Sequence, residues 1–409
     1  MAVAKGEMKV IVVAAFFPPA GGVGTFRVRK FVKYLSEFGV SPAVVTMTVD
    51  EYSRIGWQMD AEGLGDVPTG VAVYRSDAAK VPFVRDIGIR WTFSLLRKLR
   101  LAVKRERPDL LMFTGDPFFP MIWGVYFKLF YGLPYVLDFR DPWALAGRDG
   151  SRRSAKLRLV DLVTNIVEAL VLRYCAYAIV VSEEMRTQYQ RNYNALKARF
   201  VVITNGYDPD DYSEAPVDRR AGNGVIYAGK FRMNEKLRNP KELFRALKML
   251  KVEGVHLDFV HIGTEEPEIV SLARESGLDG NQTRFEGYLP LRETIGCIKG
   301  AKIAVLIGGG QASEQTTKVF DYMACGVPIL AIGRKDSSAG RILLGYKSSI
   351  VVNNDAVEIA SALRGLLRLK PDGRRGLLPV YSRRNLAGQL SELFAMAIMD
   401  KRKNGVVQG

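Results

Sequence analysis

Residues 313–330, SEQTTKVFDYMACGVPIL, carry the pattern on which the predicted fold depends. The first half has the polar residues of a helix start, followed by apolar positions at helical spacing. Gly326 then ends the helix, and Pro328 prevents it from continuing. Because the residues after Pro328 are apolar without interruption, they predict a buried strand. The segment therefore has the helix-then-strand order of an α/β protein.

The start of this helix is also a candidate anion site. Thr316, Thr317 and Lys318 place hydroxyl groups and a cation beside the N–H groups of a helix N-terminus. Lys318 and Asp321 are three positions apart and therefore share a face of the helix. A cation and a carboxylate in this arrangement could serve a ligand that has both a phosphate and a diol. An ordinary surface ion pair explains the spacing equally well.

The same alternation of strands and helices runs through the whole chain. The apolar run at 9–17 predicts a central strand, the glycine turn at 18–24 leads into a helix, and 43–48 predicts the next strand. A polar stretch at 208–224 separates this series from a second one, which begins with a strand at 225–228. We predict an α/β fold of two doubly wound, Rossmann-like halves.

The composition narrows the class of protein. A chain of 409 residues with 48% apolar content is long enough for two cores. Its formal net charge of +16 favours an anionic partner, which could be nucleic acid, anionic lipid or a diphosphate-bearing substrate. The three cysteines are far apart without metal-type spacing, so we expect reduced thiols in a cytosolic protein. The apolar stretch near the N-terminus runs into the glycine turn, and we interpret it as a strand and not as a signal peptide.

Two motifs in the first half lie where strands are predicted to end. In the glycine turn, Gly21 and Gly22 let the backbone approach a pyrophosphate without a Cβ in the way, although such turns are also common packing. Asp138, Arg140 and Asp141 follow another strand at its carboxyl end, where open α/β sheets bind ligands. The planar guanidinium of Arg140 suits bidentate contacts with an anion, and a structural Asp–Arg pair is the alternative.

The second half offers a basic loop after its first strand. Lys230 follows the glycine at the end of that strand, and Arg238 stands shortly before the next helix. Fixed cations there would stabilise the charge that a departing nucleoside diphosphate gains in the transition state, whereas solvated surface side chains are the alternative. Asp208 and Asp210 spell a D-x-D sequence, but no acidic or histidine cluster surrounds it, so we predict no metal site.

Five blocks in this order resemble the family 4 retaining glycosyltransferases, which have the GT-B fold. The blocks are FPPAGG at 17–22, DFRDPW at 138–143, NGYD at 205–208, GK at 229–230 and KVFDYMACGVP at 318–328. The first two are similar to the FPP-x-GG and D-x-RDPW motifs of one branch of the family. One departure is that the first acidic residue of the family's E-x7-E pattern falls on Ser313, with Glu314 one residue later.

The resemblance implies a division of roles between two domains. Residues 1–205 would face the acceptor, residues 206–383 would bind a nucleotide sugar, and the helix at 384–409 would cross back onto the first domain. The implied donor-binding residues are Gly21, Gly22, Asn205, Gly206, Lys230, Arg238, Glu314, Gln315, Thr316, Thr317, Lys318 and Asp321. The implied catalytic residues are Lys230, Arg238 and Asp116, and the acceptor-side residues are Asp138, Arg140 and Asp141. The reaction would be retaining and would need neither a metal nor a cofactor.

A basic, aromatic stretch predicts contact with a membrane. Residues 85–107 contain eight Lys or Arg residues interleaved with Trp91, Phe93 and several aliphatic residues. A basic amphipathic helix of this kind can lie on anionic lipid, although a core helix with a solvated basic face has the same pattern. We therefore expect a lipid-linked saccharide acceptor and a cytoplasmic protein bound peripherally to the inner face of the membrane. No helix-turn-helix, RNA-recognition or zinc-finger pattern accompanies the charge, so we do not expect nucleic acid as a partner.

Two other functions fit the same motifs. A nucleotide-sugar epimerase of the GT-B class would share the fold and the phosphate loops but would need no acceptor. A catalytically inert family member that assembles at a membrane would fit the missing acidic residue at Ser313. The sequence leaves the donor sugar, its nucleotide base and the acceptor open.

Overall fold

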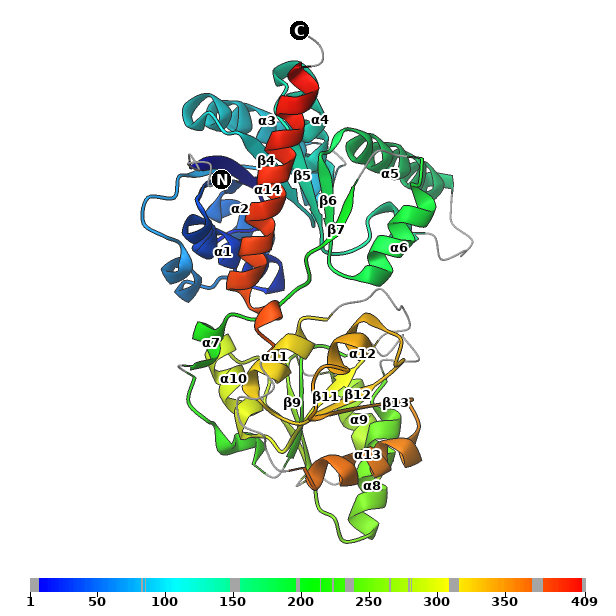
Figure 1. Ribbon diagram of the computed structural model, residues 1–409. Helices are drawn as coiled ribbons and strands as arrows, with labels where there is room; N and C mark the ends of the chain where they lie inside the picture. The colour runs from blue at the N-terminus through cyan, green and yellow to red at the C-terminus, as the bar shows by residue number, and fades with distance from the viewer. Residues whose placement is uncertain are drawn as a thin grey trace. The chain divides into compact units, whose positions relative to one another are not determined.

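The computed structural model describes residues 7–81, 84, 86–147, 155–195, 199–213, 215–222, 224–231, 239–264, 266–278, 280, 282–308, 316–369 and 378–406. The chain forms two compact units, Met1–Thr204 with Arg383–Gly409 and Asn205–Ser382. Each unit is a parallel sheet between helices (Figure 1). The predicted fold class of two Rossmann-like α/β halves is therefore confirmed.

The first unit contains, among its described residues, a sheet of seven parallel strands in the order β3-β2-β1-β4-β5-β6-β7. The strands are β1 (Met8–Val13), β2 (Val40–Met47), β3 (Val73–Ser76), β4 (Leu110–Thr114), β5 (Tyr135–Phe139), β6 (Tyr177–Val180) and β7 (Phe200–Val202). The helices are α1 (Val23–Leu35), α2 (Val49–Arg54), α3 (Ile87–Glu106), α4 (Ile122–Tyr131), α5 (Ala155–Tyr174), α6 (Glu183–Asn192) and α14 (Arg383–Val406).

The order of the strands reverses direction at β1. This strand pairs with β2 on one side and with β4 on the other, so that Val10 lies opposite both Pro42 and Leu110. In open α/β sheets, the carboxyl ends of the strands at such a switch point form the usual ligand crevice. The glycine turn after β1 and the loop after β4 lie there.

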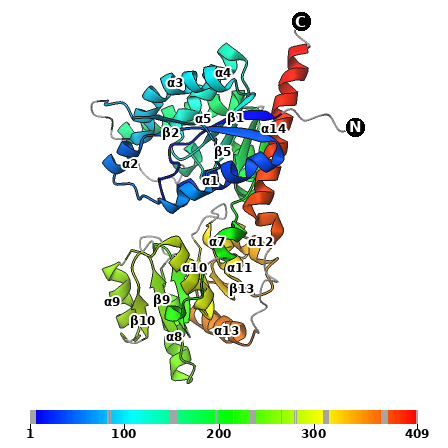
Figure 2. The same ribbon diagram turned by 90° about the vertical axis from the view of Figure 1, so that its left-hand side faces the viewer.

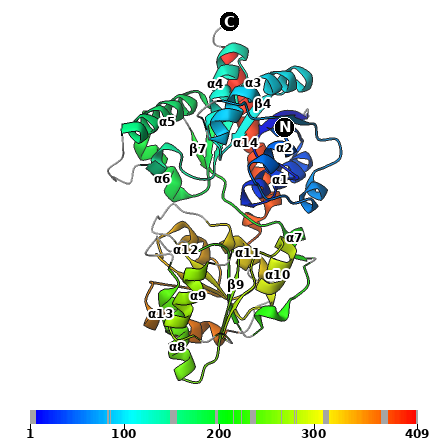
Figure 3. The ribbon, with the colours of Figure 1, turned by 180° about the vertical axis from the view of Figure 1, so that it is seen from behind.

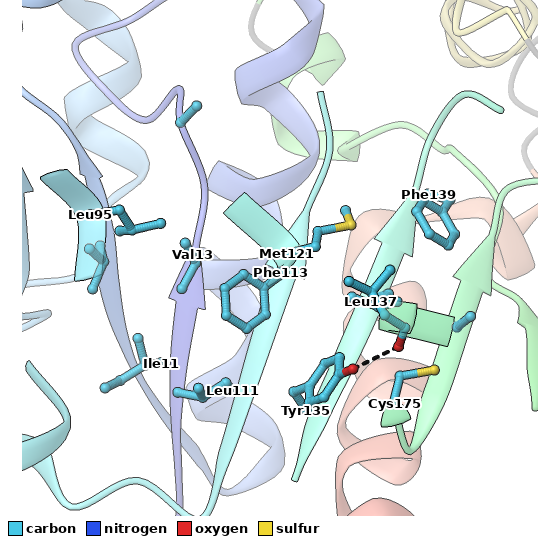
Figure 4. Close-up of a cluster of buried hydrophobic side chains, with 14 of the residues drawn as sticks. Ile11, Val13, Leu95, Leu111, Phe113, Met121, Tyr135, Leu137, Phe139 and Cys175 are labelled. Atoms are coloured by element: carbon cyan, nitrogen blue, oxygen red, sulfur yellow. Dashed lines mark hydrogen bonds between the residues drawn. The ribbon is translucent and has the colours of Figure 1, made fainter. Parts of the chain in front are cut away.

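The core of the first unit covers both faces of the sheet. On one face, Ile11, Val13 and Phe113 pack with residues of α3 and α4, and Figure 4 shows this cluster. The hydroxyl of Tyr135, also drawn there, donates to the carbonyl of Val171 at 2.7 Å. Because strands with two covered faces must be apolar throughout, the uninterrupted apolar runs of the sequence are explained.

The opposite face of this sheet is covered by α1 and by the last helix, α14. Leu390 and Phe394 of α14 pack against Val28 and Phe31 of α1. The hydroxyl of Ser391 adds a hydrogen bond of 3.1 Å to the carbonyl of Phe38. The final helix therefore belongs to the first unit although the second unit precedes it in sequence (Figures 1 and 2).

Helix α3 contradicts one part of the membrane prediction. Trp91, Leu95 and Leu99 are the large apolar side chains of its amphipathic pattern, and each is at most 1% exposed. They pack into the core of the first unit, and the basic residues of α3 remain in solvent together with Phe93 and Leu101. Most of the apolar face of this helix is therefore not available to lipid. None of the described helices is long and apolar enough to cross a membrane.

The second unit has a parallel sheet with the order β10-β9-β8-β11-β12-β13 among its described residues. The strands are β8 (Gly224–Ala228), β9 (Asp258–Ile262), β10 (Thr283–Phe285), β11 (Ile303–Ile307), β12 (Ile329–Ile332) and β13 (Ser349–Val352). The helices are α7 (Pro209–Ser213), α8 (Lys241–Val252), α9 (Pro267–Glu275), α10 (Leu291–Gly300), α11 (Lys318–Cys325), α12 (Ser338–Leu343) and α13 (Ala356–Leu367).

This sheet also reverses its order at its first strand. β8 pairs with β9 on one side and with β11 on the other, which places a second switch point at the carboxyl end of β8. Helices α8, α9 and α13 contribute the apolar side chains on one face, and α10, α11 and α12 contribute those on the other. The loop that begins with Gly229 therefore lies at the position where this half would bind a ligand.

Candidate functional site

The helix predicted from residues 313–330 forms at the edge of this second switch point. Helix α11 runs from Lys318 to Cys325, and Val319 and Phe320 are fully buried in the core below it. Gly326 ends the helix in the left-handed conformation, with a φ of 71°, as a C-cap glycine should. Strand β12 follows, so the predicted helix, stop and strand are confirmed.

Lys318, the first residue of α11, lies against the end of strand β8. Its ammonium donates a hydrogen bond of 2.9 Å to the hydroxyl of Tyr227 and lies 4.2 Å from the centre of that ring. A Cβ on Gly229 would collide with Cε and Nζ of Lys318, and Gly229 has a φ of 126° that other residues rarely adopt. Gly229 therefore makes the space in which this cation is held.

Buried aromatic side chains fix Tyr227 and the loop that follows it. The Tyr227 ring stacks on Phe231 with a centroid distance of 4.2 Å, and its hydroxyl donates to the carbonyl of Lys230 at 3.1 Å. Nε2 of His261, which is 1% exposed, lies 2.7 Å from the carbonyl oxygen of Gly229. His261 thus holds the glycine loop beside Lys318.

The polar residues before α11 complete the helix start. The backbone N–H of Lys318 donates to Oγ1 of Thr316 at 3.4 Å, and the carbonyl of Thr317 accepts from the N–H of Phe320 at 3.0 Å. Thr316, Thr317 and Lys318 are each partly exposed. A cation and two hydroxyls therefore border the positive end of a helix that points to the switch point, which is a suitable arrangement for a phosphate.

Asp321, one turn along α11, is held by a buried tyrosine. The hydroxyl of Tyr212 in α7 donates to its carboxylate at 2.5 Å. Burial, together with the charge of Asp321, holds the pKa of Tyr212 well above its usual value, so the phenol remains a donor. Asp321 itself is partly exposed and retains acceptor sites that could bind the two hydroxyls of a diol.

The other residues predicted for the donor site have different surroundings. Lys230 is exposed directly after Gly229, whereas Asn205 is 7% exposed and Gly206 is buried in the connection to α7. The predictions for Arg238, Glu314 and Gln315 lie outside the described residues.

In the first unit, the glycine turn is tied to residues 57 and 58, which lie far from it in sequence. The N–H of Gly21 donates to the carbonyl of Gln58 at 2.8 Å, and its carbonyl accepts from Nε1 of Trp57 at 3.0 Å. The carbonyl of Gly22 accepts from the N–H of Thr25 at 3.0 Å. Because the N–H of Gly21 already donates to Gln58, a phosphate at this position would have to bind to the first N–H groups of α1.

Arg140 connects the loops at the carboxyl ends of three neighbouring strands. Its guanidinium donates to the carbonyls of Gly24 (2.5 Å), Gly115 and Asp116 (3.5 Å). Burial lowers the pKa of Arg140, and the carboxylates of Asp138 and Asp141 counter part of this effect. The side chain therefore organises the edge of this sheet, through backbone carbonyls and not through the Asp–Arg pair considered as the alternative for this motif.

Asp138 forms its ion pair with a different arginine. Its carboxylate is fully buried and accepts from Nη2 of Arg27 at 2.9 Å and from the hydroxyl of Thr114 at 3.1 Å. Arg27, which is 1% exposed, also donates to the carbonyls of Ile203 and Thr204. Asp138 thus has no exposed oxygen, and any effect on an acceptor would pass through the loops that it positions.

Asp116 and Asp141 present their carboxylates at the surface near Arg140. Partial desolvation raises the pKa of Asp116 above its usual value, Asp86 and Asp141 raise it further, and Arg140 opposes the rise. A carboxylate that accepts a proton more readily than usual is suited to general base chemistry. The structure thus brings Asp116, Arg140 and Asp141 together at one edge of the first unit.

Three residues of these two sites were not predicted from the sequence. Tyr227 and Tyr212 hold the cation and the carboxylate of α11, and Arg27 neutralises Asp138. Arg27 could have been found from the sequence, because it lies on the core-facing side of a predicted helix and a charge on a buried face needs a partner. For the tyrosines the sequence carries no comparable signal, because each partner comes from a distant element.

The two units, each with a switch point and a glycine loop, define the GT-B class, and comparison with known proteins agrees. Residues 20–211 match the family model described as Glycosyltransferase Family 4, and residues 222–368 match Glycosyl transferases group 1. Each of the two units therefore matches a glycosyltransferase family model, and the fold is of the GT-B class. No curated protein matches the sequence.

Solved structures with the same fold are distant in sequence. Sucrose-phosphate synthase from Thermosynechococcus elongatus is 15% identical with a TM-score of 0.60, covering 98% of this chain and 99% of its own. WaaG, a glycosyltransferase involved in lipopolysaccharide biosynthesis, is 12% identical with a TM-score of 0.60 and coverages of 96% and 98%. UDP-GlcNAc 2-epimerase from Methanocaldococcus jannaschii is 9% identical with a TM-score of 0.56 and coverages of 95% and 99%.

Proposed function

We propose that the protein transfers a sugar from a nucleotide-sugar donor to a lipid-linked saccharide acceptor, as in the synthesis of cell-surface polysaccharide or lipopolysaccharide. The observation that carries this proposal is the position of Lys318, which Tyr227 and Gly229 hold at the start of α11. A fixed cation beside a helix N-terminus is suited to the diphosphate of such a donor. The match of each unit to a glycosyltransferase family model supports the choice of reaction.

In this proposal the second unit binds the donor. Lys318 and the helix start hold the diphosphate, Asp321 accepts hydrogen bonds from the ribose hydroxyls, and Lys230 approaches from the exposed loop. A diphosphate gains negative charge as it leaves, so cations that are already in position lower the barrier without reorganisation. We propose on this basis a reaction that needs no metal, in which Arg238, Glu314 and Gln315 add to the donor site.

The first unit would hold the acceptor, with the turn at Gly21 and Gly22 facing the donor phosphates. We propose a retaining reaction, in which the acceptor hydroxyl attacks from the face that the phosphate leaves and the phosphate takes up the proton. Asp116 and Asp141 border the position for the acceptor, while Arg140 and Asp138 keep their loops in place. We also propose that the chain belongs to the FPP-x-GG and D-x-RDPW branch.

An epimerase remains the second candidate, because UDP-GlcNAc 2-epimerases are among the proteins with a similar fold. An epimerase would convert the sugar without an acceptor, whereas an inert family member would not bind the donor. Incubation with a panel of labelled nucleotide sugars, with and without a membrane lipid extract, separates the three functions. We expect nucleotide release that depends on the extract. Sugar conversion without extract would support the epimerase, and the absence of donor binding would support the inert protein.

A further inference from the structure

Helix α5 (Ala155–Tyr174) exposes large apolar side chains on its outer face, where a surface helix normally has polar residues. The large apolar side chains on its outer face are Leu159 (62% exposed), Leu162 (57%), Val163 (44%), Ile166 (58%) and Leu170 (37%). These positions are three or four residues apart and therefore form one ridge, which extends about 17 Å at 1.5 Å per residue. We call these five residues the α5 ridge; α5 lies along the outside of the first unit (Figure 3).

The inner face of α5 packs in the core through Val171 and Leu172 and also carries one buried carboxylate. Glu168 is fully buried and accepts hydrogen bonds from the N–H of Ala144 at 2.8 Å and from the hydroxyls of Tyr189 and Tyr193. Because this face already packs in the core and Glu168 is held by these hydrogen bonds, the helix cannot rotate to hide its ridge without losing both. The exposure of the ridge is thus built into the packing of this unit.

A basic pocket lies at the C-terminal end of the ridge. It has a volume of about 540 Å³, and its cations are Lys128, Arg173, Arg199 and Lys401. One carboxylate, Asp400, lines it and pairs with Arg199 at 2.7 Å. Among the described residues no carboxylate pairs with Lys128, Arg173 or Lys401, so the pocket has an excess of positive charge.

The pocket lies away from the candidate active site. Pro134 and Ala176 line it, and each directly precedes a strand, so the pocket is at the amino ends of β5 and β6. The acceptor-side residues lie at the carboxyl ends of the strands. Burial and the neighbouring Lys401 lower the pKa of Lys128, and an anion in the pocket would relieve both effects.

Exposed aromatic residues continue the surface on the other side of the pocket. Leu129, Phe130 and Tyr131 follow Lys128 directly at the end of α4 and are 57%, 74% and 55% exposed. Helices α4 and α5 pack against each other, so the α5 ridge, the pocket and this end of α4 belong to one region of the first unit. Aromatic residues beside cations are typical of the interface between lipid and water.

We propose that the α5 ridge and the end of α4 dock on an anionic phospholipid bilayer, and that the basic pocket binds a lipid phosphate headgroup. Charge complementarity favours a bilayer as the partner. The apolar ridge would contact the acyl chains, and the unpaired cations at its end would contact the phosphate headgroups. The net charge of +16 favours the same partner. This inference builds on the proposed membrane contact but assigns it to α5 and α4 in place of α3.

The test is flotation of the full chain with vesicles of phosphatidylcholine alone or mixed with phosphatidylglycerol. One variant combines Leu162→Ser with Ile166→Ser on the ridge, and another combines Lys128→Ala with Arg173→Ala in the pocket. We expect wild type to float with the anionic vesicles. The pocket variant should lose about 30-fold in partitioning, at roughly 1 kcal/mol for each of its two basic residues, and the ridge variant should lose at least about tenfold because it removes apolar contact with the acyl chains. Adding inorganic phosphate should compete only weakly, because it lacks acyl chains for the ridge.

Two matched controls make the result specific. The pair Val252→Ser with Leu344→Ser removes even more exposed apolar groups from the second unit, and Arg97→Ala with Arg105→Ala removes exposed cations from α3. Both controls should float as wild type does. An equal loss in the α3 control, or binding that ignores anionic lipid, would overturn the proposal. So would ridge variants that float normally but change from dimer to monomer in sedimentation, since the ridge would then bind a second copy.

Donor binding to the same variants separates this inference from the proposed function. Because the ridge and pocket lie in the first unit, nucleotide binding by the second unit should be unchanged in all of them. Failure to float together with intact donor binding refutes only the docking surface. Normal flotation without donor binding refutes only the proposed function.

Discussion

The contact between Gly229 and Lys318 gives a specific prediction about the donor site. Gly229→Ala introduces a Cβ where Cε and Nζ of Lys318 now lie, and the cation must leave its position on Tyr227. If Lys318 binds the diphosphate, its loss or displacement removes a hydrogen bond to a charged group. We expect a loss of about 1–3 kcal/mol in either single variant, or roughly 5-fold to 150-fold in Kd.

The two substitutions should not be additive. Once Lys318→Ala has removed the ammonium, the new Cβ at position 229 has nothing to displace, so the double variant should bind as weakly as Lys318→Ala alone and no more weakly. Calorimetric titration of all three variants with UDP, GDP and ADP gives the Kd values. The donor's nucleotide is identified by the wild-type titrations in the same series.

Gly254→Ala is the control for backbone strain. Gly254 has a φ of 82°, but a Cβ there would meet no atom within 4 Å. Both alanine variants should lose about 1–2 kcal/mol of folding stability from the left-handed backbone, and only Gly229→Ala should lose nucleotide affinity. Unchanged affinity in Gly229→Ala, or losses that add in the double variant, would refute the assignment of Lys318.

Three further predictions concern the groups around both sites. Asp138→Ala should lower the free energy of unfolding by about 3–5 kcal/mol in denaturant titration, because it leaves the buried charge of Arg27 without its carboxylate. Tyr212→Phe should lower the affinity for ribonucleoside diphosphates about fivefold, because Asp321 loses the hydrogen bond that holds it in place. The affinity for 2′,3′-dideoxy analogues should be unchanged. Asp116→Asn should become increasingly stable relative to wild type as the pH rises above 3.8. The raised pKa of this carboxyl means that its favourable contribution exists at low pH and disappears as the group ionises.

Each of these predictions has an outcome that would contradict it. The exposed pair of Arg364 with Glu253 at 2.7 Å is the control for Asp138, since breaking an exposed pair costs about 1 kcal/mol or less. If Asp138→Ala lowers the free energy of unfolding no more than breaking the Arg364 pair does, the buried pair contributes as little to stability as a surface pair. If Tyr212→Phe lowers the affinity for the ribose and the dideoxyribose ligands equally, Asp321 does not bind the ribose diol. A stability difference at Asp116 that is constant with pH would show that its carboxyl does not titrate abnormally.

Local patterns were sufficient to predict the fold. The apolar runs of β1 and β12 and the Gly326-Val327-Pro328 stop are short-range features, and each has one physical interpretation. The start of α11 at Lys318 followed from the same kind of information, because helix ends have characteristic residues. The resemblance to a known family added the prediction that the two halves form one GT-B protein.

The side-chain partners were less predictable than the elements. DFRDPW suggested an ion pair between Asp138 and Arg140, but Asp138 pairs with Arg27, which is 111 residues away. The same limitation explains α3 and α5. The basic residues of α3 suggested lipid, although its apolar face packs into the core, whereas α5 carries an exposed ridge that periodicity alone could not distinguish from a buried one.

The most direct test of the proposed transfer is incorporation of labelled sugar into an extractable lipid product, once the donor has been identified. The account predicts product from wild type only when donor and lipid acceptor are both present, with the anomeric configuration of the donor retained. Lys318→Ala should form product far more slowly at donor concentrations below Kd. Product formation that is unaffected by Lys318→Ala, or sugar conversion without acceptor, would contradict it.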